Sequence, residues 1–160
     1  MPMLPGPDST HPAQLASWRS MEAVARGDKQ AWLDNFTDDA IVEDPVGKSM
    51  IDPTGDGHRG KAAIEAFWDE HIADVRPMFC LQSSICCGNE CANIGTLTIQ
   101  FANGMITQLY GIFKYTVDDE GRVTALRTFW ETDDMSVHPP FDQRGAALES
   151  GSSNGRERND

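Results

Sequence analysis

The stretch Phe36-Thr-Asp-Asp-Ala-Ile-Val-Glu-Asp-Pro-Val-Gly47 holds a short apolar segment that ends in a carboxylate. Ala40, Val42 and Asp44 occur at every second position, which predicts a strand with Asp44 on the same side as Val42. A carboxylate beside aliphatic side chains loses hydration, so its charged form is disfavoured and Asp44 becomes a candidate proton shuttle. The alternative is that Asp44 and Pro45 form a turn in which the aspartate bonds its own backbone.

Two helices are predicted before this strand. The first begins at Thr10 to Pro12, since proline suits the first helical turn, and it ends at Gly27 with one apolar face along its length. Asp28 is placed to cap a second, short helix, in which Trp32 and Phe36 would lie one turn apart. Both aromatic side chains are therefore expected in the core.

A long loop and a third helix follow the strand. The loop, Lys48 to Arg59, is rich in glycine and aspartate and is expected on the surface, where it would form a lid over a cavity mouth. The helix is predicted from about Lys61 to Val75, with Trp68 and His71 on its apolar stripe. His71 is either a hydrogen-bonded histidine at the edge of the core or a residue with a ligand-binding or catalytic role.

The second half of the chain has the pattern of strands. They are predicted at residues 78–87, 93–102, 105–117 and 122–131, and Asn103-Gly104 is a strong hairpin signal between two of them. Three helices followed by a curved, mostly antiparallel sheet indicate an α+β cone.

The third of these long strands has two partly apolar faces. Phe113 and Tyr115 share one face, which is expected to line the interior of the cone. Tyr110 and Ile112 share the other, and together with Phe129 of the next strand they would suit a homodimer contact through the outer surface of the sheet.

Composition narrows the class of protein and the domain organisation. The chain has 160 residues and a formal charge of -12, which argues against nucleic acid and anionic membranes as partners because both need a basic face. There is no apolar run of membrane-spanning length and no signal-peptide pattern, so a cytoplasmic protein is expected. One domain is predicted at residues 11–138, between a disordered lead-in at 1–10 and a disordered tail at 139–160.

The spacing of the cysteines and the lack of cofactor motifs also limit the chemistry that is expected of this protein. Cys80, Cys86, Cys87 and Cys91 crowd together but contain no Cys-x-x-Cys pair, so reduced structural thiols are favoured over a metal site. No nicotinamide, flavin or phosphate motif occurs, and no cofactor is expected.

Several spaced motifs carry a resemblance to a known family. They are Gly27-Asp28, Trp32, Phe36, Asp38-Asp39-Ala40, Val42 to Gly47, Gly60-Lys61, Ile64, Ala66 to Trp68, Asp119 to Arg122 and Phe129-Trp130. In this order they resemble bacterial ketosteroid isomerases, which share the cone-shaped nuclear transport factor 2-like, or SnoaL-like, fold with polyketide cyclases, dehydratases and plain ligand binders. The resemblance implies a small hydrophobic, steroid-like ligand.

The resemblance also implies roles for individual residues. Asp44 aligns with the catalytic base of the isomerases, whereas Ser20 stands where they have a catalytic tyrosine and Phe113 where they have an aspartate that donates a hydrogen bond. The family's oxyanion hole is therefore missing, and Tyr115, Trp130, His71 or Ser20 would have to supply a donor. The positions expected to bind the substrate are Ser20, Phe36, Trp68, His71, Phe113, Tyr115 and Trp130.

Three functions fit this combination. The first is a weak or altered isomerase with Asp44 as base. The second is a non-catalytic binder of steroid-like molecules, because Phe113 makes the cavity floor more apolar. The third is a cyclase or dehydratase that acts on another substrate, since the fold by itself does not determine the activity.

Overall fold

The computed structural model describes residues 3–140, so most of the predicted tail at 139–160 lies outside the described residues. Its helices are α1 (Pro12–Arg26), α2 (Lys29–Asp34), α3 (Lys61–His71) and the 3-10 turn η1 (Thr132–Asp134). Its strands are β1 (Phe36–Glu43), β2 (His58–Arg59), β3 (Val75–Cys87), β4 (Glu90–Phe101), β5 (Ile106–Val117), β6 (Val123–Phe129) and β7 (Ser136–His138). No helix within residues 3–140 is long and apolar enough to cross a membrane.

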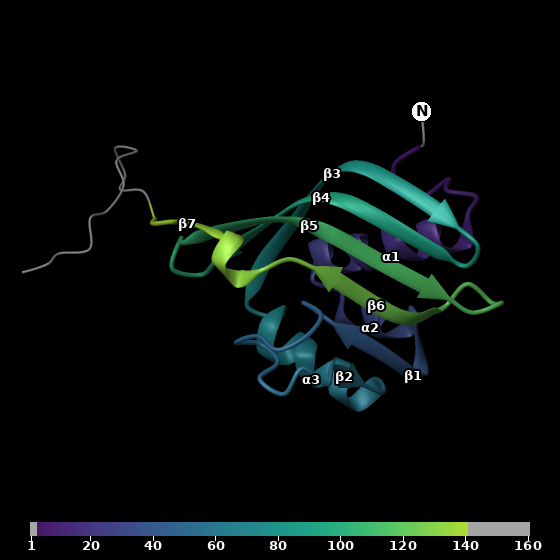
Figure 1. Ribbon diagram of the computed structural model, residues 1–160, viewed down its shortest axis with the longest axis horizontal. Helices are drawn as coiled ribbons and strands as arrows, with labels where there is room; N and C mark the ends of the chain where they lie inside the picture. The colour runs from purple at the N-terminus through teal and green to yellow at the C-terminus, as the bar shows by residue number, and fades with distance from the viewer. Residues whose placement is uncertain (1–2, 141–160) are drawn as a thin grey trace, which may run out of the picture.

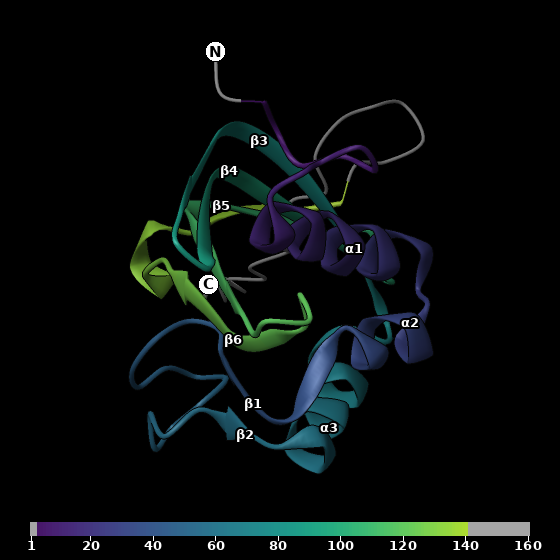
Figure 2. The ribbon, with the colours of Figure 1, turned by 90° about the vertical axis from the view of Figure 1, so that its right-hand side faces the viewer.

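The strands form one curved sheet in the order β2-β1-β6-β5-β4-β3, and β7 pairs with β5 beyond the end of β6 (Figure 1). The sheet curls in an arc, with α1 against its inner side and α2 and α3 beside β1 (Figure 2). Neighbouring strands are antiparallel except β1 and β6, which run parallel. The predicted α+β class with a curved, mostly antiparallel sheet is confirmed, and the one parallel pair makes the sheet mixed.

The helix boundaries follow from local signals. His11 caps α1 by accepting a hydrogen bond from the backbone N–H of Ala13, and Gly27 ends the helix in the left-handed conformation that favours glycine. Asp28 caps α2 as predicted, but α2 ends at Asp34. Phe36 therefore begins β1 and does not belong to the second helix, which corrects the prediction.

The third helix is also shorter than predicted. It ends at His71, because the backbone N–H groups of Ile72 and Ala73 both bond to the carbonyl of Trp68 and turn the chain toward β3. Strand β3 accordingly starts at Val75, where the sequence pattern had predicted helix.

The strong bend of the sheet depends on two glycines that face each other. Gly95 of β4 pairs with Gly111 of β5, beside a bulge in β3 between Leu81 and Ser83. A Cβ atom at Gly95 would lie 2.3 Å from the carbonyl oxygen of Cys80, which is closer than any real contact. The absence of a side chain at Gly95 thus lets β3 and β4 approach where the sheet curves.

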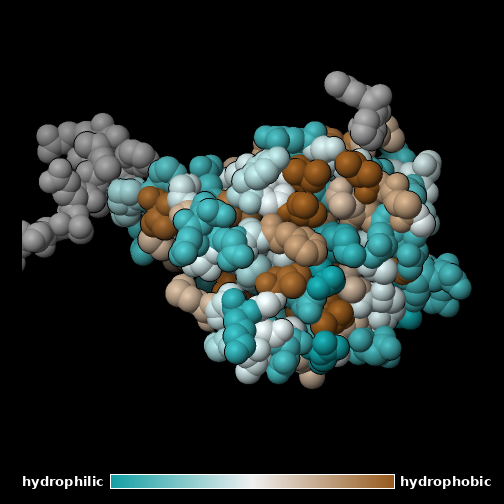
Figure 3. Space-filling view, in the orientation of Figure 1, coloured by the Kyte–Doolittle hydropathy of each residue, from teal (hydrophilic) through white to brown (hydrophobic). Residues whose placement is uncertain are grey.

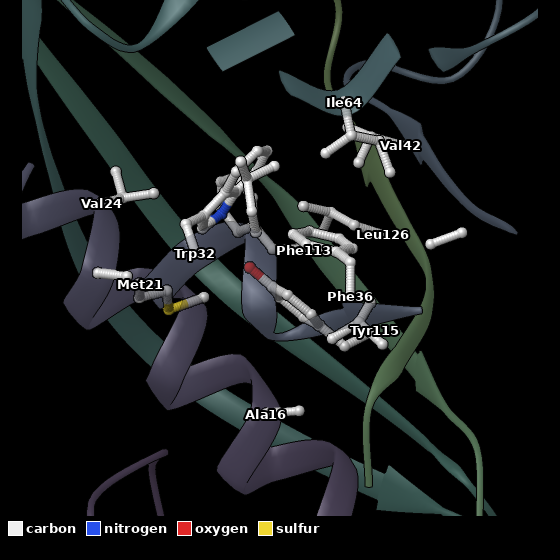
Figure 4. Close-up of a cluster of buried hydrophobic side chains, with 14 of the residues drawn as sticks. Ala16, Met21, Val24, Trp32, Phe36, Val42, Ile64, Phe113, Tyr115 and Leu126 are labelled. Carbon is white, nitrogen blue, oxygen red and sulfur yellow. The ribbon is translucent and has the colours of Figure 1, made fainter. Parts of the chain in front are cut away.

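The core lies between the helices and the concave face of the sheet (Figure 4). Trp32 packs edge-on against Phe36, with ring centroids 4.8 Å apart, and tilts against Trp68 at 5.3 Å. The segment before α1 also packs on the domain: Ser9 is buried, and the side chain of Gln14 donates to the carbonyl of Met3. The described part of the predicted lead-in, residues 3–10, thus contacts the rest of the domain through these two residues.

Candidate active site

A cavity of about 440 Å³ opens between the helices and the inner face of the sheet. Apolar side chains from α1, α3 and strands β3 to β6 make up most of its wall. Six of the residues expected at the site line it: Ser20, Asp44, His71, Phe113, Tyr115 and Trp130. Phe36 and Trp68, which were also expected at the site, do not line this cavity and are buried in the core.

Asp44 reaches the cavity because of how β1 pairs with β6. The two strands are in register with Glu43 opposite Arg127, so the next position along brings Asp44 beside Thr128. Glu43 and Arg127 form an ion pair on the outer side of the sheet. Since side chains alternate between the two faces, Asp44 and Thr128 point inward.

Both hydrogen bonds to the Asp44 carboxylate reach the same oxygen. The Thr128 hydroxyl donates to Oδ1 at 2.5 Å, and the Trp130 indole N–H donates to Oδ1 at 3.0 Å. Asp44 is thus bonded across the sheet to β6, and the turn alternative, in which it bonds its own backbone, does not occur. No side-chain donor among residues 3–140 bonds to Oδ2, which leaves that oxygen available for a proton.

The surroundings raise the pKa of Asp44. Burial is the largest cause, because it disfavours the charged carboxylate, and the hydrogen bonds from Thr128 and Trp130 oppose it only in part. The nearby His58 and His71 also oppose it weakly. A carboxyl group with a raised pKa in an apolar cavity has the properties of a general base.

A second polar group lies in the cavity wall where α1 meets β5. The Ser20 hydroxyl accepts hydrogen bonds from the Trp32 indole N–H and from the Tyr115 hydroxyl, each at 3.0 Å. Figure 4 shows the Tyr115 hydroxyl directed toward Trp32 and α1. Burial raises the pKa of Tyr115, so its hydroxyl stays protonated at neutral pH.

One hydroxyl hydrogen of this group is left to form a hydrogen bond with a ligand. Ser20 and Tyr115 carry two hydroxyl hydrogens, of which one forms the bond between them, while Trp32 can only donate. The remaining hydroxyl hydrogen has no side-chain acceptor among residues 3–140. In the observed arrangement, where Tyr115 donates to Ser20, the free hydrogen is on Ser20. If Ser20 donated to Tyr115 instead, the free hydrogen would be on Tyr115.

The side chains of His71 and Phe113 add different properties to the cavity wall. His71 lies half-buried at the end of α3 with its ring centroid 5.1 Å from that of Phe67, and burial lowers its pKa, which favours the neutral imidazole. Phe113 packs edge-on against Phe79 with centroids 5.3 Å apart, so its position adds apolar wall and no hydrogen-bond donor.

The loop at 48–57 contributes Met50 and Ile51 to the cavity lining. Asp52 holds the loop in shape by accepting hydrogen bonds from the backbone N–H groups of Gly55 and Gly57. The loop thus lies against the cavity, and its role as a lid stays a prediction. Within residues 3–140, no cluster of three or more His, Cys, Asp or Glu side chains is arranged to hold a metal ion.

Thr128 is a site residue that sequence analysis missed, and Trp32, which also lines the cavity, was expected only in the core. Thr128 lies two positions before Trp130 and therefore on the same face of the chain, which was a usable signal. Its contact with Asp44 depends on the parallel pairing of β1 and β6, and nothing in the local sequence indicates that pairing.

Comparison with known proteins agrees with this fold. The SnoaL-like domain model matches residues 19–126. A steroid Delta-isomerase from Nocardioides simplex is 28% identical over 121 residues, which cover 76% of this chain and 91% of that protein.

Two crystal structures are also similar. The Delta 5-3-ketosteroid isomerase from Mycobacterium sp. has a TM-score of 0.77 at 38% identity, covering 80% of this chain and 99% of its own. RV0760c from Mycobacterium tuberculosis, in complex with estradiol-17beta-hemisuccinate, has a TM-score of 0.76 at 36% identity, covering 79% and 99%. The resemblance inferred from the spaced motifs is confirmed, and the chain belongs to the SnoaL-like family, with ketosteroid isomerases among its relatives.

Proposed function

We propose that the protein moves a carbon–carbon double bond in a steroid-like or other polycyclic ketone by cofactor-free proton transfer, with Asp44 as the base. The observation that carries this proposal is the arrangement at Asp44. Two donors bind Oδ1, no side chain within residues 3–140 bonds to Oδ2, and the carboxyl group with its raised pKa lies in the wall of a largely apolar cavity. The relatives named as steroid isomerases support the same chemistry.

The proton transfer uses one atom of the protein. Asp44 Oδ2 takes a proton from the carbon next to the ketone, the electrons of the broken C–H bond form a new carbon–carbon double bond, and the carbonyl oxygen becomes an enolate oxygen. The same carboxyl group then returns the proton two carbons further along, and the carbonyl re-forms in conjugation with the moved double bond. No atom is gained or lost, and a positioned base of this kind contributes about 10²- to 10⁴-fold in rate.

The group formed by Ser20, Tyr115 and Trp32 is proposed to bind the ketone oxygen. Its spare hydroxyl hydrogen would donate to the carbonyl and more strongly to the enolate oxygen. The Trp32 N–H and the Tyr115 hydroxyl both donate to Ser20, which polarises the Ser20 O–H bond toward stronger donation. Phe113 supplies no second donor, and a missing oxyanion donor costs about 10²- to 10³-fold, so turnover is expected to be slow.

The size and lining of the cavity suit a polycyclic ligand. Its volume of about 440 Å³ falls within the range of small-molecule sites. Most of the wall is apolar; its polar groups are Asp44 with Thr128, the hydroxyls of Ser20 and Tyr115, His71 near Glu70, and Thr107. A rigid hydrocarbon skeleton with one carbonyl oxygen would satisfy these features.

Phe113 specifically favours a second function, the non-catalytic binding of the same ligands. It makes the wall apolar where the family's enzymes place a hydrogen-bond donor, which improves contact with a hydrocarbon skeleton and weakens enolate stabilisation. The two functions share a ligand and differ only in whether Asp44 moves a proton.

The deciding experiment combines binding with turnover. Steroid and other polycyclic ketones are first screened by the shift in unfolding temperature, and those that bind are supplied as β,γ-unsaturated ketones. The appearance of the conjugated ketone is then followed by ultraviolet absorbance for the wild type and Asp44→Asn. Turnover that depends on Asp44 supports the isomerase, whereas equal binding with no rate above buffer in either protein supports the binder.

We also propose a homodimer that forms through the outer face of the sheet. Tyr110 is 59% exposed, Phe129 40% and Ile112 36%, and Ile112 and Phe129 are direct partners across β5 and β6. Figure 3 views this face and shows hydrophobic side chains among polar ones over the middle of the sheet. A contact through this face would leave the cavity, on the opposite side of the sheet, open to ligand.

A further inference from the structure

Two cysteines that the proposed reaction does not use face each other at the end of the β3–β4 hairpin. The turn consists of Gly88 and Asn89, Cys87 pairs with Glu90 beside it, and Cys86 pairs with Cys91 at the next position. In a two-residue hairpin, the second pair from the turn is the pair without backbone hydrogen bonds, whose side chains approach most closely. The sulfur atoms of Cys86 and Cys91 are 3.1 Å apart.

This separation is close to bonding geometry. Opposite residues of a pair without backbone hydrogen bonds have Cα atoms about 4.5 Å apart, which lies within the range that disulfides span. The sulfur atoms, 3.1 Å apart, need to come about 1 Å closer to reach the length of a disulfide bond. The other two cysteines, Cys80 and Cys87, are exposed on the outer face of β3.

The surrounding hydrogen bonds permit the two thiols to lose their hydrogens. Cys86 donates to the sulfur of Cys91, and the buried Cys91 thiol bonds to Asn93 Oδ1 at 3.5 Å. Asn93 Oδ1 also accepts a shorter bond, 2.8 Å, from the Ser84 hydroxyl. Removing both thiol hydrogens therefore leaves Asn93 with a partner, so no buried acceptor is left unsatisfied.

We propose that Cys86 and Cys91 form a redox site that closes to a disulfide on reaction with a small-molecule disulfide. The half-buried Cys86, as thiolate, attacks one sulfur of the oxidant, and one equivalent of the small thiol leaves. Cys91 then loses its proton and attacks Cys86 in the mixed disulfide, which releases the second equivalent. The protein pair is oxidised by two electrons, and the small disulfide is reduced to two thiols.

The cysteine pair lies next to residues of the cavity wall. Cys91 lies directly opposite Tyr115 in the pairing of β4 with β5, and Cys86 continues the same row across β3. Asn93, which contacts Cys91, donates to Ser17 of α1 one turn before Ser20. Oxidation would thus join β3 to β4 beside the residues proposed to bind the ketone oxygen.

The test uses the full-length chain in two matched variants. Cys80→Ser/Cys87→Ser retains only the proposed pair, and Cys86→Ser/Cys91→Ser retains only the exposed cysteines. Each is treated with oxidised glutathione at about pH 9, since burial and the bond to Cys91 raise the pKa of Cys86 to about 12 and alkaline solution supplies more thiolate. Free thiols are then alkylated in denaturant and the intact mass is measured.

The variant that keeps the pair is expected to lose two hydrogen atoms of mass, to carry no glutathione and to resist alkylation until a reductant is added. The variant that keeps Cys80 and Cys87 is expected to gain glutathione adducts, because those two side chains are exposed on the strand surface. The proposal is overturned if the Cys80→Ser/Cys87→Ser protein, with its native circular dichroism spectrum, keeps two alkylatable thiols or ends as a stable glutathione adduct. Closure of the pair only after unfolding would overturn it as well.

Discussion

Replacing Asp44 with asparagine tests the proposed base with little change to the structure. The asparagine carbonyl oxygen can occupy the place of Oδ1 and keep both hydrogen bonds, from Thr128 at 2.5 Å and Trp130 at 3.0 Å. The amide nitrogen then takes the place of Oδ2 and faces the cavity. The side chain keeps its size and loses its basicity, so the substitution isolates the proton-transfer step.

The expected loss of rate follows from the role of the base. Without it, kcat for isomerisation should fall by about 10²- to 10⁴-fold, while the affinity for the ketone should change little because the cavity wall is unchanged. Initial rates from ultraviolet absorbance and dissociation constants from ligand titration measure the two effects separately.

The free energy of unfolding should be higher in Asp44→Asn than in the wild type, although the rate of isomerisation is lower. Burial raises the folded-state pKa of Asp44 above the unfolded value of about 3.9, so the wild type loses stability as pH rises through the folded-state pKa. The Asp44→Asn variant has no ionisable group at this position, so it does not lose stability in this way. At neutral pH the free energy of unfolding of Asp44→Asn should therefore exceed that of the wild type by about 1.4 kcal/mol for each unit by which the pKa is raised, and the difference should vanish below about pH 4.

Glu43→Gln is the matched control. Glu43 is the neighbouring carboxylate, but it pairs with Arg127 on the outer side of the sheet, so its loss should leave the rate unchanged. If Asp44→Asn folds, binds the ketone and turns it over within about threefold of the wild type, Asp44 is not the base, because a positioned base contributes at least about 10²-fold.

Four further predictions concern other residues. Thr128→Val removes a hydrogen bond to the Asp44 carboxylate that is worth about 1.5–3 kcal/mol. The acid limb of the pH profile of kcat/KM should therefore move up by about one to two pH units, and an unmoved limb would show that the pKa of Asp44 does not set that limb. Ser20→Ala should lower kcat by about 10²-fold or more with a smaller effect on ketone binding, and equal losses in both would mean that the hydroxyl acts only in binding. Gly95→Ala would place a Cβ 2.3 Å from a backbone oxygen and should cost at least about 1–3 kcal/mol of unfolding free energy by denaturant titration, whereas Gly6→Ala, with nothing within 4 Å, should cost far less. Ile112→Arg should convert a dimer to a monomer in sedimentation velocity, and a wild type that is monomeric at micromolar concentration would refute the proposed dimer.

Local sequence determined the parts of this protein that depend on neighbouring residues. The period of two at residues 40–44 gave the direction of Asp44, because alternation in a strand is a property of the backbone alone. The same rule placed Phe113 and Tyr115 inside and Tyr110 and Ile112 outside. Cap residues set the start and end of α1 for a similarly local reason.

Pairing with distant strands explains the errors in the predicted element boundaries. Trp32 and Phe36 have helical spacing, yet Phe36 belongs to a strand, because α2 ends after Asp34 and the chain pairs with β6. The predicted third helix is cut short in the same way, since β3 takes up Val75 by pairing with Phe101. In both places, pairing with a distant strand prevailed over a weak local preference for helix.

Contacts between distant residues were decided only by the tertiary structure. Thr128 meets Asp44 across 84 positions of the chain, and Tyr115 meets Ser20 across 95. The first contact depends on the parallel pairing of β1 with β6. The second depends on how the sheet curls around α1, at the bulge in β3 and the facing glycines Gly95 and Gly111. Sequence periodicity fixes which face a side chain takes, but sheet curvature and strand order fix which side chains meet across the cavity.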